Sequence, residues 1–270
     1  MKHNTMEKNN FNIAVLIDGD NAQPKLLGAM LEEVSKYGKA TIRRIYGDWT
    51  MQQMNGWKEI INEYSFNPVQ KFAYTSGKNS TDSALIIEAM DILHGKNIDG
   101  FCIVSSDSDY TGLAKRIREE GIFMMGIGQK KTPKAFVQSC EIFTFSENIL
   151  NVPQLKGAAE PEVIEGDLKP EKLDLAFIDK AFDISSTEGE EEVYISKLGL
   201  TLRKIDPSFD PRAYGFKSLT QLFRSLPTYS VLHNEQNPMV KREIVAAKPK
   251  PSRKLRNLKT KPNDRSKSAE

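Results

Sequence analysis

The 270-residue chain has few cysteines and histidines and no long apolar run. Its two cysteines, Cys102 and Cys140, are too few for a disulfide framework and lack metal-ligand spacing, which favours a reducing compartment. No apolar stretch approaches the roughly 18 residues that span a bilayer. The first ten residues are polar and lack the apolar centre of a signal peptide. We therefore expect a soluble, cytoplasmic protein without a membrane partner.

Other absences narrow the chemistry. The three histidines, His3, His94 and His233, are scattered and have no partner in sequence, so we assign no histidine-based catalysis. The chain has no GxGxxG or GxxxxGK[ST] motif for cradling phosphates. The serines of segment 105–108 have no base beside them, which argues against a serine nucleophile. Carboxylates are the remaining candidates for catalytic groups, and their positions in the sequence decide which chemistry we predict.

Charge is unevenly distributed, although the net charge is only +2. Segment 246–270 carries nine Lys/Arg against two acids, a net +7 that leaves the rest of the chain at −5. Its composition predicts disorder. Such a basic segment suits non-specific attraction to nucleic acid through counterion release, or serves as a solubilising extension.

Short apolar runs alternate with stretches of helical periodicity over residues 11–150. The expected strands are 13–17, 40–46, 68–74, 100–104, 122–127 and 142–145, and the expected helices are 24–38, 49–64, 81–93, 110–120 and 133–139. This alternation predicts an α/β fold of three layers (α/β/α) around a mostly parallel sheet.

A second, smaller domain is expected after a change in composition. Segment 151–169 is rich in Gly, Ala, Pro and Glu and is predicted to be a linker, while segment 1–10 is predicted to be a disordered lead-in. Segment 170–245 contains a helical stripe at 173–182, a further helical piece from residue 193, a helix at 218–226 and a hairpin strand at 229–232. Helices followed by a small hairpin predict a winged helix-turn-helix.

Four aspartates are expected at the same edge of the large sheet. Asp18 ends the first strand, Asp107 and Asp109 follow the fourth, and Asp82 begins the helix after the third. Ligands of open α/β sheets bind at the carboxyl ends of the strands. Clustered carboxylates repel one another unless a cation lies among them, and oxygen ligands without nearby His or Cys favour Mg²⁺ or Mn²⁺. Metal-assisted phosphodiester hydrolysis is the natural use of such a site.

Each acid alone also has an ordinary structural interpretation. Asp82 would suit the first turn of a helix through the helix dipole. Asp107 or Asp109 would suit an N-cap, and Asp20-Asn21 would suit a turn. Their convergence on one edge is what favours a metal or phosphate site.

Residues 11–150 resemble a NYN domain, the PIN-like nuclease branch that includes the LabA-like proteins. The motifs that carry the resemblance are Ile17–Asn21, Lys78–Asp82 and Val104–Tyr110. The resemblance implies a Mg²⁺- or Mn²⁺-dependent ribonuclease with Asp18, Asp82, Asp107 and Asp109 as catalytic and metal-binding residues. The sequence departs from the family pattern at Ser106, where the family often has glycine. Asp91, a further acid in the family position, faces roughly the other side of its helix and ranks lower.

Further residues are candidates for binding substrate. They are Asn21, Ser105, Lys78, Lys130 and Lys131. Lysines on loops beside the acidic edge, Lys134 included, could hold phosphates, although solvated loop lysines are the ordinary alternative. Arg43 and Arg44 alternate along a strand, so at most one could face the site. Trp49 and Tyr110 could stack on bases, with core packing the stronger interpretation for Tyr110.

Residues 170–245 resemble an OST-HTH (LOTUS) domain. The motifs are Leu173–Phe182, Tyr194–Gly199 and Tyr214–Phe223. The resemblance implies RNA binding or contact with a protein partner, rather than catalysis; a purely structural helical domain is the alternative.

The leading hypothesis is a metal-dependent endoribonuclease or RNA-processing enzyme with an RNA-binding winged helix. A non-catalytic RNA-binding adaptor is the first alternative. A second arises from Asp18-Gly19-Asp20, which resembles the nucleophile motif of haloacid-dehalogenase-type phosphatases. The sequence leaves the RNA substrate, the choice between RNA and DNA, and the oligomeric state open.

Overall fold

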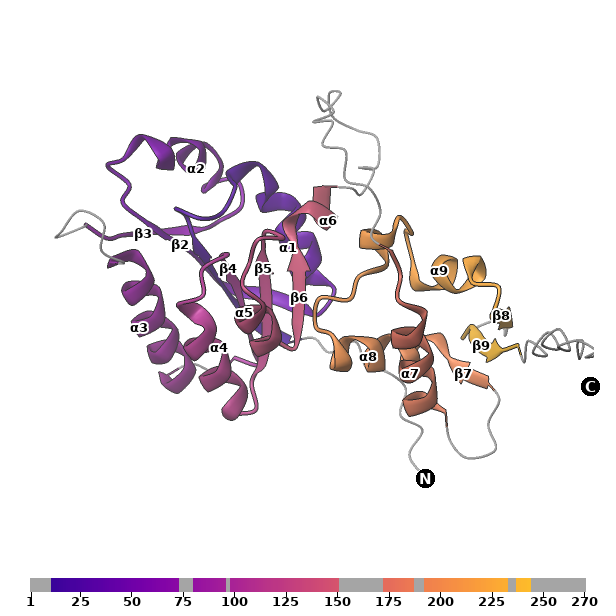
Figure 1. The fold of residues 1–270 in the computed structure, drawn as a ribbon. Helices are drawn as coiled ribbons and strands as arrows, with labels where there is room; N and C mark the ends of the chain where they lie inside the picture. Colours follow the sequence, from indigo (N-terminus) through magenta and orange to yellow (C-terminus); the bar gives the residue numbers. More distant parts are fainter. Residues whose placement is uncertain are drawn as a thin grey trace, which may run out of the picture.

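The computed structural model describes residues 11–72, 80–95, 98–150, 172–186, 192–232 and 237–243. Its first unit contains a six-stranded sheet with the strand order β3-β2-β1-β4-β5-β6, in which all neighbouring strands are parallel (Figure 1). The strands are β1 Phe11–Asp18, β2 Gly38–Gly47, β3 Asn67–Gln70, β4 Gly100–Val104, β5 Phe123–Gly128 and β6 Ile142–Phe145. All six predicted strands are therefore present.

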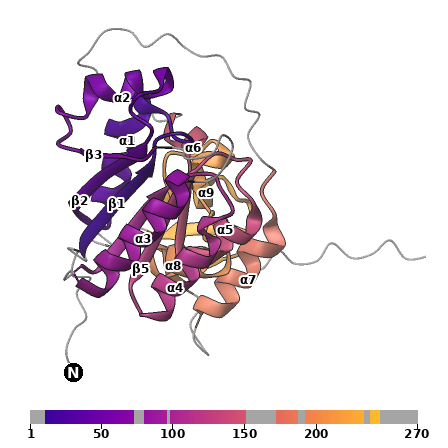
Figure 2. The same cartoon turned by 90° about the vertical axis from the view of Figure 1, so that its left-hand side faces the viewer.

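Helices cover both faces of this sheet (Figure 2). They are α1 Leu27–Ser35, α2 Asn55–Ile60, α3 Ser80–Gly95, α4 Tyr110–Glu119, α5 Lys134–Ser139 and α6 Ser146–Leu150, with 3-10 turns η1 Pro24–Leu26 and η2 Gln52–Met54. Successive side chains of a strand point to opposite faces. Ile13, Val15 and Ile17 accordingly pack with α1, α2 and α6, whereas Ala14 and Leu16 pack with α3, α4 and α5. The predicted three-layer α/β/α fold is confirmed.

Two predicted elements are shorter than expected. The third strand ends at Gln70, although the sequence pattern continues to Tyr74. The helix expected from Trp49 begins only at Asn55, after η2. Its first residues instead form a turn, because the Asp48 carboxylate accepts hydrogen bonds from the Thr50 N–H and hydroxyl. The predicted lead-in (1–10), linker (151–169) and basic segment (246–270) lie outside the described residues.

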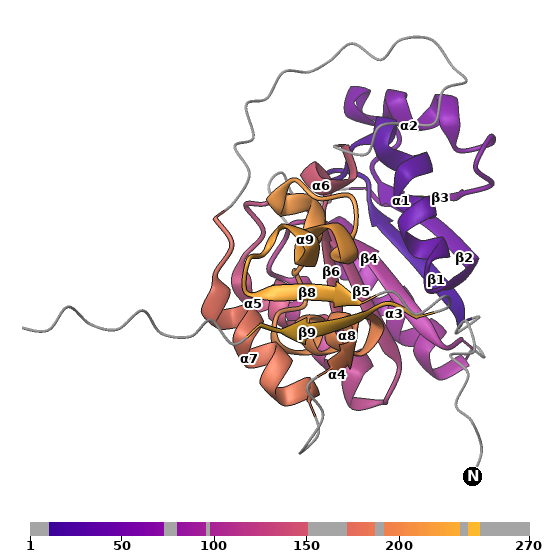
Figure 3. The ribbon, with the colours of Figure 1, turned by 90° about the vertical axis from the view of Figure 1, so that its right-hand side faces the viewer.

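The second unit is a small winged helix-turn-helix (Figure 3). Its elements are α7 Leu175–Ser185, β7 Glu192–Tyr194, α8 Ile195–Ile205, η3 Pro211–Tyr214, α9 Leu219–Ser225, β8 Tyr229–Leu232 and β9 Met239–Arg242. The three strands form an antiparallel sheet in the order β7-β9-β8. The predicted start of the second helix, at Val193, is wrong. Val193 pairs with Val240 in this sheet, and α8 starts at Ile195.

No helix within the described ranges combines the length and the apolarity that crossing a membrane requires.

Candidate metal centre

The ends of β1 and β4 lie side by side at the carboxyl edge of the sheet. Ile17 pairs with Val104, so the loops that follow the two strands start together. Gly19 turns the first loop, and its N–H donates to the Tyr46 carbonyl oxygen at 2.8 Å. A Cβ at position 19 would lie 2.8 Å from that same oxygen, so this close approach requires glycine. The turn leaves Asp18 facing the loop that follows β4.

Three carboxylates from two elements meet at this edge. One oxygen from each of Asp82, Asp107 and Asp109 lies within 4.8 Å of the other two. Asp82 is in the first turn of α3, and the other two precede α4. Asp82 is buried, Asp107 half-buried and Asp109 exposed, so the group opens to solvent on one side. An all-oxygen donor set without nitrogen or sulfur fits Mg²⁺ or Mn²⁺.

Asp18 lies beside this group but is not one of the three. Its side chain is fully buried, and both carboxylate oxygens accept hydrogen bonds. The Asn21 amide donates to Oδ2 at 2.7 Å and the Ser105 hydroxyl donates to the same oxygen at 2.9 Å. The backbone N–H of Asp20 donates to Oδ1. The geometry therefore brings together three of the four predicted metal ligands and holds the fourth in a hydrogen-bonded position next to them.

Ser105 connects the two parts of the site. Its hydroxyl is buried, donates to Asp18, and accepts a hydrogen bond from the Asp107 N–H at 3.1 Å. It was predicted to contact substrate, whereas here it joins the β1 and β4 loops. Asn21, predicted to bind substrate or metal-bound water, uses its amide N–H on Asp18. Its side chain also lines a small pocket with Ser105, Ser106 and Gln129.

The acids raise one another's proton affinity. Burial raises the pKa of Asp18 above its ordinary value, while the hydrogen bonds from Asn21 and Ser105 lower it and the charge of Asp82 raises it. Burial also raises the pKa of Asp82; the Tyr110 hydrogen bond opposes this, and the charges of Asp107 and Asp109 add to it. A cation placed among these carboxylates would relieve the repulsion between them.

Tyr110 is a site residue that the sequence analysis assigned to the core without a partner. Its ring is fully buried, as expected, but its hydroxyl donates to Asp82 Oδ1 at 2.7 Å. Burial, and then the charges of Asp18 and Asp82, hold the pKa of Tyr110 far above its ordinary value, so the hydroxyl stays a donor. In the sequence, Tyr110 comes directly after Asp109 and ends the motif Val104–Tyr110, but nothing there pairs its hydroxyl with Asp82.

The lysines predicted to flank the acidic edge differ in where they lie and in what they contact. Lys78 lies outside the described residues. The backbone N–H of Lys130 donates to both oxygens of Glu147, which anchors the loop after β5 on α6. Lys131 and Lys134 are exposed near that loop and at the start of α5.

Other candidates face away from the carboxylate group. Arg43 donates to the Tyr64 carbonyl, and Arg44 pairs with Glu88 at 2.5 Å. Asp91 lines a separate pocket together with Arg44 and Glu88. The indole N–H of Trp49 donates to the Val69 carbonyl, which leaves Trp49 packed against the core.

Comparisons with known proteins identify the families of the two domains. A family model of the NYN domain matches residues 12–147, about half of the chain, and a model of the OST-HTH/LOTUS domain matches residues 181–240. A crystal structure of a protein of unknown function from Vibrio parahaemolyticus is similar over 54% of this chain and 98% of its own, with 15% identity and a TM-score of 0.45. No curated protein matches the chain.

The match over residues 12–147 identifies the parallel α/β sheet and its edge carboxylates as a NYN domain, a PIN-like member of the nuclease superfamily. The chain belongs to the NYN family, and an OST-HTH/LOTUS domain follows its NYN domain. Both resemblances drawn from the sequence motifs are thus confirmed.

Proposed function

We propose that this protein is a metal-dependent endoribonuclease that hydrolyses RNA phosphodiesters at the carboxyl edge of its NYN domain. The observation that carries the proposal is the meeting of Asp82, Asp107 and Asp109 within 4.8 Å at this edge. These three residues would hold Mg²⁺ or Mn²⁺. A divalent ion there supplies Lewis acidity toward a phosphate and lowers the pKa of bound water.

The surrounding residues have distinct roles in this proposal. Tyr110 and Ser105 position the acids through their hydroxyl groups, on Asp82 and on Asp18 respectively. Asp18 supplies negative charge behind the metal ligands, and Asn21 lies at the adjoining pocket. Lys130 and Lys131 lie on the loop where they would contact RNA phosphates.

The phosphatase alternative requires Asp18 to attack a phosphorus atom. Its side chain is 0% exposed, and both of its oxygens already accept hydrogen bonds. A carboxylate in that position is poorly placed as a nucleophile, because the attacking oxygen needs free access to the substrate. The hydrogen bonding of Asp18 therefore favours the nuclease over the phosphatase.

The test is RNA cleavage by the purified full chain, with single-stranded and structured RNAs and either Mn²⁺ or Mg²⁺. Asp107→Asn should abolish cleavage. Asp91→Asn is the matched control, because Asp91 is an exposed acid in a separate pocket, and it should retain activity. RNA binding without cleavage by any of the three proteins would overturn the nuclease proposal and favour a non-catalytic adaptor.

A further inference from the structure

The OST-HTH domain lies against the β6 side of the NYN sheet (Figures 1 and 3). β6 ends the strand order, and an edge strand presents unpaired backbone groups. The N–H of Phe143 in β6 donates to the carbonyl oxygen of Pro207 at 2.9 Å. Pro207 is in the loop between α8 and η3, so the second domain satisfies part of the sheet edge.

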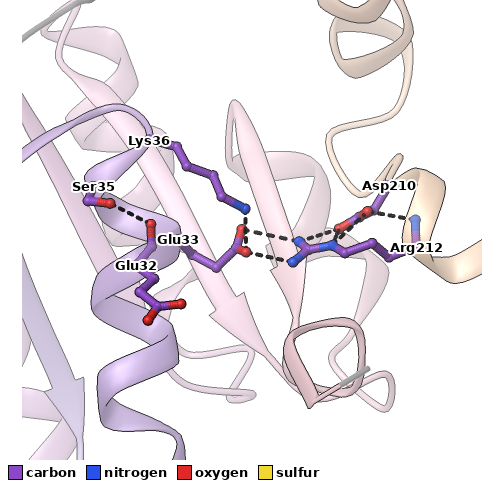
Figure 4. Close-up of polar contacts among 6 residues, drawn as sticks. All are labelled: Glu32, Glu33, Ser35, Lys36, Asp210 and Arg212. Carbon is purple, nitrogen blue, oxygen red and sulfur yellow. Dashed lines mark hydrogen bonds and ion pairs between the residues drawn. The ribbon is translucent and has the colours of Figure 1, made fainter. Parts of the chain in front are cut away.

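A charged contact holds the two domains in one orientation (Figure 4). The Arg212 guanidinium donates to both Glu33 oxygens, at 2.6 and 3.1 Å, and to both Asp210 oxygens. The side chains of Arg212 and Glu33 are only 15% and 7% exposed. Lys36 also contacts Glu33, so two cations face two anions. Among these pairs, the one between Arg212 and Glu33 joins the two domains, so replacing either residue removes the charged contact between them.

Tyr37 belongs to the same contact. It follows α1 in the NYN domain; burial raises the pKa of its hydroxyl, and the charges of Arg203, Asp210 and Arg212 from the second domain also influence that pKa. Its ring packs against Phe123 of β5. The docking surface therefore runs from the end of α1 to the edge of the sheet.

The strand order places the functional groups in a row along the carboxyl edge. The carboxylates belong to β1, β4 and the start of α3, at the middle of the sheet. The loop after β5, with Lys130 and Lys131, comes next, and β6 with the docked domain follows. Lys217, just before α9, and Arg224, within α9, are both exposed. The α9 helix lies toward the end of the molecule to which β6 points (Figure 1).

We infer that the lysines after β5 and the docked OST-HTH domain extend the acidic edge into one track for a single RNA strand. The strand runs from the three carboxylates toward β6, and the Arg212 contact sets the distance between the bound segment and the cleaved bond. This inference rests on the proposed ribonuclease function for its catalytic part, whereas the docking itself does not.

Small-angle X-ray scattering of the full chain tests the docking. The wild type should scatter as a compact two-domain particle. Arg212→Gln and Glu33→Gln, one from each domain, should each increase the maximum dimension, and the double variant should add little to either. Arg116→Gln, which removes an arginine paired on the surface of α4, should change nothing. Extended wild-type scattering would overturn the docking, and an unchanged profile in both single variants with folded circular dichroism spectra would overturn the role of the Arg212 contact in setting it.

Single-stranded RNAs of increasing length test the track. For the wild type, kcat/KM should rise by about tenfold once a strand reaches both domains, since the second contact then acts at high effective concentration. Arg212→Gln should lose this dependence on length while cleaving the shortest RNA at the wild-type rate. Lys131→Gln combined with Lys134→Gln should raise KM for long RNA, and Lys115→Gln on α4 should not.

The outcomes separate the two proposals. If the wild type cleaves no RNA, the proposed function fails, and fluorescence anisotropy with the same RNAs still measures the track through the dependence of affinity on length. If the wild type cleaves but Arg212→Gln shows the same dependence on length, the track is wrong and the nuclease stands.

Discussion

At the scale of single residues, the site depends on hydroxyl groups as much as on carboxylates. The Tyr110 hydroxyl donates to one oxygen of Asp82, and the charges of three acids surround it. This hydrogen bond fixes which Asp82 oxygen is left for a metal ion. Groups that donate a hydrogen bond to a metal ligand orient that ligand in many metal sites. Tyr110 thus positions a metal ligand without touching substrate.

Replacing Tyr110 with Phe should lower RNA cleavage by about tenfold and weaken Mn²⁺ binding, because Asp82 loses its donor. Loss of one hydrogen bond should reduce the free energy of unfolding by about 1 kcal/mol. Tyr46→Phe is the matched control, since Tyr46 is equally buried and its hydroxyl donates to Glu88 instead. Tyr46→Phe should lower the free energy of unfolding by a similar amount and leave RNA cleavage unchanged. Equal losses of activity in the two variants would show that Tyr110 has no particular role.

Asp82 should show a conflict between stability and function. Its pKa is raised, so the ionised form opposes folding; this cost is absent below the ordinary value of 3.8 and complete once the pH exceeds the raised pKa. In chelator at neutral pH, Asp82→Asn should therefore have a higher Tm than the wild type, and the difference should shrink toward pH 4. Added Mn²⁺ should raise the Tm of the wild type alone. A lower Tm for the variant in chelator would contradict this.

At the scale of elements, the site is made by two strand-loop units that Ser105 joins. Ser105→Ala should leave Asp18 and the Asp107 N–H each short of a partner and reduce the free energy of unfolding by about 1–3 kcal/mol. Cleavage should fall as well, since the β4 loop loses its link to β1. Ser106→Ala is the neighbouring control: its hydroxyl accepts from the Gln129 N–H and does not reach Asp18. Chemical denaturation and cleavage rates measure both, and equal activity of the two variants would refute the role of Ser105.

The elements also show what the sequence could reveal. The apolar runs of β1 and β4 predicted buried strands, and from them followed the common edge of Asp18, Asp107 and Asp109. The pattern could not show that the third strand stops at Gln70, because the end of an outer strand depends on what pairs with it. Nor could it pair Glu33 with Arg212, since a contact across 179 residues leaves no periodic signal.

At the scale of the whole molecule, charge is divided between an acidic body and the basic segment 246–270. Deleting this segment should weaken RNA binding and flatten its dependence on salt, since each phosphate contact on a single strand contributes about 0.7 to the slope of log K against log salt. The value of kcat at saturating RNA should stay the same, because the carboxylates are untouched. Titrations at several salt concentrations measure the slope, and an unchanged slope would show that the segment does not contact RNA.

A crystal of the full chain, grown with Mn²⁺ and measured for anomalous scattering, shows directly whether the carboxylates at this edge bind a metal ion. We expect an anomalous peak among the oxygens of Asp82, Asp107 and Asp109, and its loss in crystals of Asp107→Asn. A wild-type crystal with Mn²⁺ bound elsewhere, and none between these three carboxylates, would show that this edge is not a metal centre.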